Sequence, residues 1–152
     1  MKNKIIISVF LAGILFLFKN LSANPTPIRD VKQVYTYYAV IDHALTLDDA
    51  KTAKNAAADL VNALQGIKDS EAALKAATAI NATNNLDAQR RSFAMLTIAL
   101  NNIFKTEKPG KMLYIHYCPM VKAYWMDESK DIANPYLGQK MPTCGKTTGM
   151  IM

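Results

Sequence analysis

Sulfur and imidazole side chains concentrate in the last quarter of this 152-residue chain, where both cysteines and six of the eight methionines follow Pro109. Five of these donors fall into two groups with short spacings. The donors are His116, Cys118, Met120, Met141 and Cys144. Thiolates and thioethers are soft ligands that favour Cu(I), and by the same argument Ag(I), over ions that prefer carboxylates and water. The residue types therefore predict a site for a soft monovalent metal ion.

Zinc is the competing metal for the same region. It would accept Cys118, Cys144 and His116 as ligands, but thioethers contribute little to zinc coordination. Two of the five donors, Met120 and Met141, are thioethers. The donor set therefore favours copper, with silver as a second soft ion.

The two cysteines have other interpretations that the sequence leaves open. In an exported protein, a pair of cysteines is most simply a disulfide, and closing a 26-residue separation stabilises a fold by about 3 kcal/mol in the loop-entropy model. The chain would then be a structural or protein-interaction module held by a Cys118–Cys144 disulfide. A thiol redox sensor is a third interpretation.

Two local elements are expected to position the donors. Residues Leu113–Tyr117 have the β-branched and aromatic character of a strand, which would place His116, Cys118 and Met120 on one face, beside solvent. Pro119 cannot donate to a sheet ladder, so the strand lies at an edge or ends there. Pro142 favours a turn that brings Met141 and Cys144 together.

The residues before Pro109 predict helices. Apolar positions recur at helical spacing in four segments. The first covers residues 28–45, the second ends near Gly66, the third begins after Ser70, and the fourth runs from Asn85 to Pro109. We expect Thr46 to cap the second helix. Amphipathic helices with short connections bury their apolar faces together, so we expect a mainly α fold. It would be an up-and-down four-helix bundle over residues 28–108, followed by an irregular tail over 109–152 with a short strand or hairpin.

Residues 1–23 have the pattern of a secretory signal peptide: two lysines, an apolar run, then small residues before Asn24. The remaining residues, 24–152, suit a single domain that is periplasmic or otherwise extracytoplasmic. An uncleaved leader is the alternative, and it would be the only contact with a membrane. Without the leader, 15 basic residues remain against 12 acidic ones, a formal charge of about +3, so nucleic acid is not expected as a partner.

No catalytic constellation is present in the sequence. Gly145, Lys146 and Thr147 resemble the end of a phosphate-binding loop, but Lys140 stands where that loop needs its first glycine. Two histidines without a serine motif do not provide a hydrolytic triad. We therefore expect a protein that is not an enzyme.

The strings YCPM, YW and IANPYLGQKMPTCG of the tail resemble the signature of a bacterial domain family of unknown function. The stretches YYAVIDHALTLDDAKTAKNAAADLVNAL and LDAQRRSFAMLTIALNNIF are similar to its helical part. Domains of that family occur alone after a signal peptide, or at the C-terminus of periplasmic adaptor subunits of copper and silver efflux pumps. The resemblance implies an extracytoplasmic helical domain that binds copper through Cys118, Met120, Met141 and Cys144. An efflux-pump adaptor or another envelope protein would be its partner.

Overall fold

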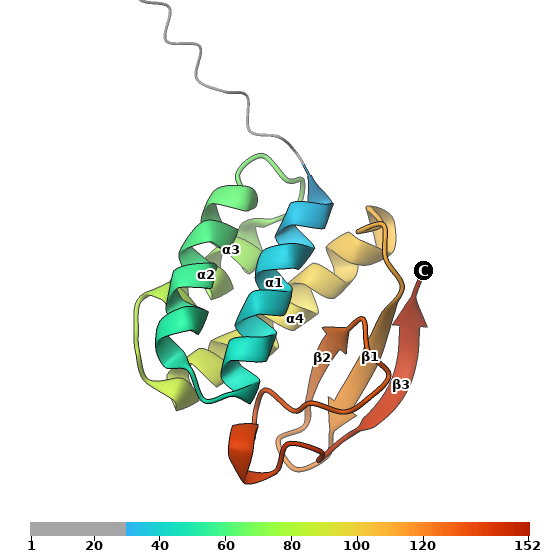
Figure 1. The fold of residues 1–152 in the computed structure, drawn as a ribbon. Helices are drawn as coiled ribbons and strands as arrows, with labels where there is room; N and C mark the ends of the chain where they lie inside the picture. The colour runs from blue at the N-terminus through green and yellow to red at the C-terminus, as the bar shows by residue number, and fades with distance from the viewer. Residues whose placement is uncertain (1–29) are drawn as a thin grey trace, which may run out of the picture.

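The computed structural model describes residues 30–152, and the expected signal peptide lies outside them. The order of elements is four helices followed by strands and one short 3-10 helix (Figure 1). They are α1 (Val31–Thr46), α2 (Ala50–Ala63), α3 (Glu71–Asn81), α4 (Leu86–Thr106), β1 (Leu113–Cys118), β2 (Ala123–Asp127), η1 (Gly138–Lys140) and β3 (Lys146–Ile151). The expectation of a mainly α fold with a strand-containing C-terminal region is confirmed.

The helix boundaries follow local capping, with one correction. Thr46 does not cap the second helix, because it is the last residue of α1 and its hydroxyl donates back to the Asp42 carbonyl. Asp49 is the cap instead, since its carboxylate accepts from the Thr52 backbone N–H at 2.9 Å. Aspartate at this position satisfies an amide that the first helical turn leaves unpaired.

The third and fourth helices begin where expected but by different means. The Asn85 side chain caps α4 by accepting from the Ala88 N–H at 2.9 Å. Ser70 precedes α3, but its hydroxyl donates to the Leu64 carbonyl at 3.2 Å and caps no helical amide. The serine therefore ties the end of α2 to the start of α3.

The three strands form an antiparallel sheet in the order β2-β1-β3. β1 ends at Cys118, directly before Pro119, and it is the central strand rather than an edge. The strand β3 is absent from the sequence-based expectation. Its pairing with β1 contains a bulge, because Ile115 pairs with Gly149 while His116 pairs with Thr147.

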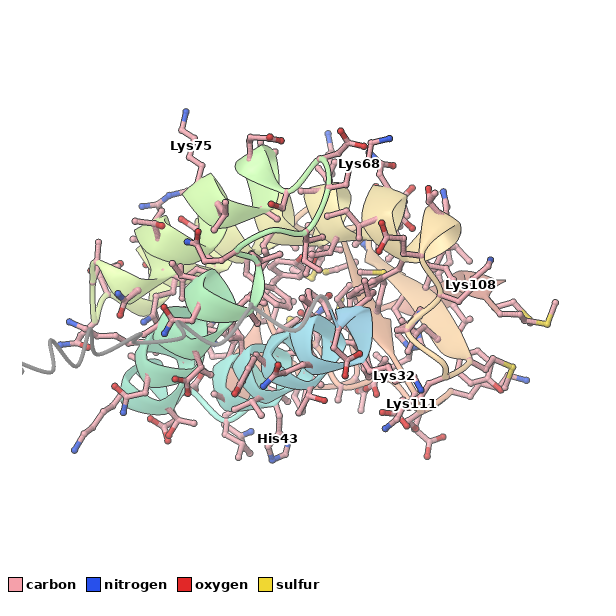
Figure 2. All side chains as sticks on the ribbon, turned by 90° about the horizontal axis from the view of Figure 1, so that it is seen from above. Lys32, His43, Lys68, Lys75, Lys108 and Lys111 are labelled. Atoms are coloured by element: carbon pink, nitrogen blue, oxygen red, sulfur yellow. The ribbon has the colours of Figure 1, made fainter. Side chains whose placement is uncertain are left out.

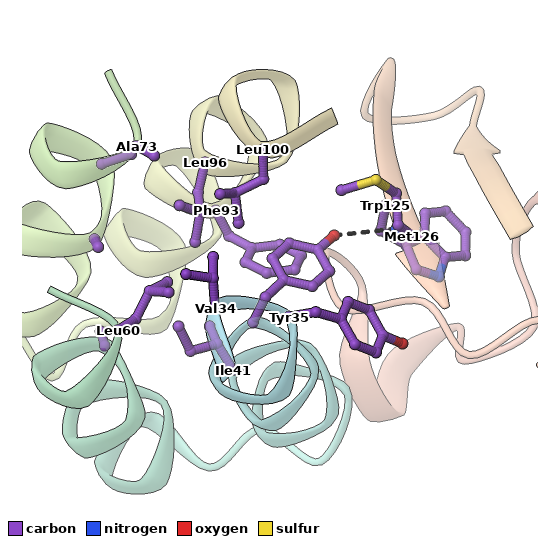
Figure 3. Close-up of a cluster of buried hydrophobic side chains, with 14 of the residues drawn as sticks. Val34, Tyr35, Ile41, Leu60, Ala73, Phe93, Leu96, Leu100, Trp125 and Met126 are labelled. Atoms are coloured by element: carbon purple, nitrogen blue, oxygen red, sulfur yellow. Dashed lines mark hydrogen bonds between the residues drawn. The ribbon is translucent and has the colours of Figure 1, made fainter. Parts of the chain in front are cut away.

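One hydrophobic core joins the helices to the sheet (Figure 3). The Tyr38 ring stacks on Phe93 at 5.0 Å between centroids, and its hydroxyl accepts from the Met126 backbone N–H at 3.0 Å. Tyr136, in the segment between β2 and β3, packs against both Phe93 and Trp125. The segment that carries the second group of donors is thus part of the core.

Within residues 30–152, every helix is too short or too polar to cross a lipid bilayer.

Candidate metal centre

The end of β1 and the turn before β3 bring the two cysteines into contact. The Sγ atoms of Cys118 and Cys144 lie 3.8 Å apart, and both thiols are free. Cys118 is fully buried, whereas Cys144 is half-buried. The turn itself has the expected form, since the Cys144 N–H donates to the Met141 carbonyl at 3.2 Å. Two thiols from positions 26 residues apart therefore share one site.

The surroundings of Cys118 favour its thiolate. Burial opposes ionisation, but hydrogen bonds from the Val121 backbone, the Asn134 side chain and the Met120 backbone act against it. Together with the Cys144 thiol they hold the pKa of Cys118 below its ordinary value. The backbone donors come from the turn that follows Pro119, so the local sequence Cys-Pro-Met-Val provides them. Cys118 is thereby prepared as an anionic sulfur donor.

The pKa of Cys144 shifts in the opposite direction. Burial raises the pKa of this thiol, and the hydrogen bond to Cys118 and the charge on that residue raise it further. The two opposite shifts mean that Cys118 ionises before Cys144, to which it is hydrogen-bonded. Binding of a cation by both sulfurs would release the protons that they still carry.

Asn134 connects the two cysteine-bearing segments and is completely buried. Its side-chain amide contacts the Cys118 sulfur and donates to the Cys144 carbonyl. Its own N–H donates to the Pro142 carbonyl at 2.7 Å, and its Oδ1 accepts from the Tyr136 N–H at 2.8 Å. Asn134 is not among the residues predicted from the sequence, although an Asn-Pro pair is a recognised turn signal.

Arg90 of α4 fixes the same segment to the helices. Its Nε donates to the Pro135 carbonyl at 2.8 Å, and its Nη2 donates to the Leu45 carbonyl at 3.0 Å and pairs with Asp48. Gly138 lies against this pair, where a Cβ would clash with the Asp48 carboxylate. A helix residue thus helps to position the turn that carries Cys144, and no local pattern marks Arg90 for that role.

Gly145 allows the Cys144 turn to approach Trp125 closely. A Cβ at this glycine would lie 2.6 Å from Cη2 of the indole, closer than real carbon contacts. Trp125 is fully buried and also packs against His116 at 5.1 Å between centroids. The buried indole therefore packs directly against the turn that carries Cys144.

His116 is placed differently from the expectation. It shares the face of β1 with Cys118, but it is fully buried rather than beside solvent. Its Nε2 contacts the Ser129 carbonyl at 3.1 Å and its Nδ1 contacts the Thr147 hydroxyl at 3.1 Å. Burial lowers the pKa of His116, against the hydrogen bond to Ser129 and the charge of Asp127. Both ring nitrogens are occupied in this conformation, so the imidazole ties β1 to its neighbours.

The two candidate thioethers lie on the turns beside the thiols. Met120 follows Pro119 and lies past the end of β1, so the expected shared strand face does not extend to it. Met120 is 60% exposed and Met141 is 43% exposed. Neither side chain is held by the core, and three rotatable bonds let each thioether sample positions near its turn.

Among residues 30–152, no three or more histidine, cysteine, aspartate or glutamate side chains come together as a metal site. Additional ligands for an ion at the cysteine pair would therefore be of another kind, and the neighbouring thioethers suit a soft ion.

A sequence model of the family described as "Protein of unknown function (DUF3347)" matches residues 34–111, just over half of the chain. The matched span contains most of α1, all of α2, α3 and α4, and ends before β1. The two cysteines and their turns thus lie outside the matched region. No curated protein and no solved structure matches the chain.

Proposed function

This chain belongs to the DUF3347 family of proteins of unknown function, and from the geometry of its cysteine pair we propose that it is a soft-metal binding protein. Its metal site would be the Cys118–Cys144 pair together with the thioethers of Met120 and Met141. The bound ion would be Cu(I), and Ag(I) would be a second ion of the same soft character. The protein would buffer the ion or deliver it to an efflux system outside the cytoplasm.

The distance between the two sulfur atoms carries this proposal. Two sulfurs bound to one ion at the zinc–sulfur distance of about 2.3 Å lie about 3.8 Å apart at a tetrahedral angle and about 4.0 Å apart at a trigonal angle. The observed 3.8 Å therefore suits joint coordination with little movement of either segment. The lowered pKa of Cys118 makes its thiol easier to ionise when an ion binds.

The donor types support copper over zinc. A zinc ion held by the cysteine pair needs two more nitrogen, sulfur or oxygen donors of its preferred kinds. The nearby imidazole of His116 has both nitrogens in hydrogen bonds, and the turns offer Met120 and Met141 instead. Thioethers bind Cu(I) and Ag(I) well because all three are soft.

The proposed location and partner rest on the sequence pattern. The leader-like residues 1–23 support export, and the resemblance to domains of copper and silver efflux adaptors supports an adaptor or another envelope protein as partner. The half-buried Cys144 sulfur supports exchange with such a partner, since an ion bound there is reachable from the surface.

A Cu(I) titration against a competing chelator tests the metal site. We expect the reduced protein to retain one copper ion at the cysteine pair, Cys118→Ser and Cys144→Ser to lose most of the affinity, and Met141→Leu to lose less. Met95→Leu, an exposed methionine on α4, is the matched control and should bind as the wild type does. Equal copper retention in all five proteins would end the proposal.

The same sulfur contact favours a second candidate function. Thiols at 3.8 Å need only a small movement to form a disulfide, and the chain would then be a structural module that docks on an envelope protein. The intact mass after thiol alkylation, with and without reductant, separates the two functions. A disulfide in freshly prepared protein that resists mild reductant would favour the structural module.

A further inference from the structure

Three methionines surround the last pair of the ladder between β1 and β3, at the opposite end of β1 from the cysteines. Leu113 pairs with Ile151, and both side chains are buried. Met112 precedes the first member of this pair, and Met150 and Met152 flank the second. Met150 is a residue of β3, where successive side chains point to opposite faces, so it lies on the face opposite the buried Ile151, and Met112 and Met152 stand directly outside the ends of β1 and β3.

The exposure of these side chains agrees with that placement. Met112, Met150 and Met152 are 46%, 54% and 75% exposed. Figure 2 shows sulfur atoms projecting freely at the end of the molecule near Lys108 and Lys111. Methionine usually fills gaps in cores, but side chains this exposed fill none. Their sulfur atoms are therefore accessible to an ion from solvent.

The strand register brings the three thioethers within reach of one another. Tyr114 pairs with Met150 and Leu113 pairs with Ile151, where the ladder ends, so Met112 and Met152 each follow directly on a paired position. Paired residues of antiparallel strands have Cβ atoms about 5 Å apart and diagonal neighbours about 7–8 Å apart, so the three side chains start from neighbouring backbone positions. Each thioether has three rotatable bonds beyond that point, which suffices for the sulfurs to converge on one ion.

We propose that Met112, Met150 and Met152 form a second site, in which three thioethers bind one soft monovalent cation, Cu(I) or Ag(I). Six residue steps along the chain separate Met112 from Cys118, about 20 Å at the rise of a strand, so this ion is distinct from one at the cysteine pair. The donors are uncharged and face solvent, which makes the site weaker and faster to exchange than a thiolate site. It does not depend on the function proposed for the cysteines.

A silver titration of a cysteine-free protein tests this site separately. The protein is Cys118→Ser/Cys144→Ser with isotope-labelled methionine methyl groups, titrated with silver nitrate in chloride-free buffer and followed by NMR. We expect the methyl signals of Met112, Met150 and Met152 to shift together and to saturate at one silver ion. Met95, 63% exposed on α4, should not follow that curve, and the buried Met126 reports that the fold is intact.

A substitution then separates a built site from scattered thioethers. Met150→Leu in the same background should weaken the saturable binding at least tenfold, whereas Met95→Leu should leave it unchanged. Parallel shifts of every exposed methionine, no shift at all, or unchanged binding by Met150→Leu would each overturn the second site. The cysteine pair is absent from these proteins, so none of these results bears on the copper affinity of Cys118 and Cys144.

Discussion

At the scale of single residues, this domain keeps several polar groups in environments that change their ionisation. Cys118 is buried yet favoured as a thiolate, because backbone and amide N–H groups point at its sulfur. Asp42 of α1 is also buried, but among residues 30–152 its Oδ1 has no hydrogen-bond donor. The contrast shows that hydrogen-bond donors, rather than burial alone, decide which form of a group the fold stabilises.

The two thiols should titrate in a defined order. We expect the thiolate absorbance of Cys144→Ser, which retains Cys118, to rise at lower pH than that of Cys118→Ser, because the donors around Cys118 remain in place. Removing the Cys118 charge should also let the pKa of Cys144 fall from its value in the wild type. Ultraviolet absorbance titrations of the single-cysteine proteins measure both values. The reverse order would show that the turn amides do not stabilise the Cys118 thiolate.

Asp42 should make the stability of the protein depend on pH. Burial, and then the charge of Asp127, raises the pKa of Asp42 well above its ordinary value, and within residues 30–152 its Oδ1 atom has no hydrogen-bond partner. The native state therefore keeps a proton that the unfolded chain releases, so stability falls as pH rises from about 4 toward the raised pKa.

We expect the stability of Asp42→Asn not to fall as the pH rises over this range. Its free energy of unfolding relative to the wild type should grow by up to about 1.4 kcal/mol per pH unit over that range. Urea denaturation at several pH values measures the difference. Asp59→Asn, at an exposed position of α2, serves as control and should run parallel to the wild type. A parallel profile for Asp42→Asn would mean that Asp42 ionises in the folded protein with its ordinary pKa.

At the scale of elements, the helices were more predictable than the sheet. The apolar stripes and the cap at Asn85 are local signals, and the helices form where these signals occur. Strand β3 depends on pairing with β1 across some thirty residues. Its sequence KTTGMI contains a glycine, and its pairing contains a bulge, so the alternation typical of a strand is not visible in the sequence.

The candidate site shows the same division between local and distant causes. The Met141–Cys144 turn and the end of β1 at Cys118 follow from their prolines. The burial of His116 does not, because it depends on packing against Trp125 and on contacts with Ser129 and Thr147 in other segments. Local periodicity contains no information about which irregular segment covers a sheet face.

Gly145 should be required for the approach of the Cys144 turn to β1. Gly145→Ala places a methyl group against the Trp125 indole, so the turn must move, at a cost of about 1–3 kcal/mol. We also expect weaker Cu(I) binding, because the two sulfurs separate. Urea denaturation and chelator competition measure the two effects.

Gly149→Ala is the matched control for this substitution. Its added Cβ would meet only Ile115 at 3.8 Å, an ordinary contact. It should change neither stability nor copper affinity to a comparable degree. Equal effects of the two substitutions would show that the contact between Gly145 and Trp125 does not position Cys144.

At the scale of the whole molecule, helices and sheet share one core and should unfold together. The Tyr38 hydroxyl connects the two parts through the Met126 amide and Thr97. We expect helical circular dichroism and the reactivity of the buried Cys118 thiol to report the same urea midpoint. A Cys118 thiol that reacts before the helices unfold would show that the C-terminal region opens as a separate unit.

Tyr38→Phe should shift both midpoints equally, because it removes the shared hydroxyl. The expected loss is about 1–3 kcal/mol, since the Met126 N–H is left without its partner. Tyr37→Phe is the control, as that hydroxyl only accepts a surface hydrogen bond from Gln33. Its effect should stay within about 0.5 kcal/mol.

The close packing of Gly145 on Trp125 also provides the protein with an optical reporter. Trp125 is the only tryptophan in the sequence, and it is adjacent to the turn that bears Cys144. A heavy ion bound at that turn would quench the indole emission. An ion at the distant methionine cluster would leave it nearly unchanged, so fluorescence of the unlabelled protein can distinguish occupancy of the two sites during one titration.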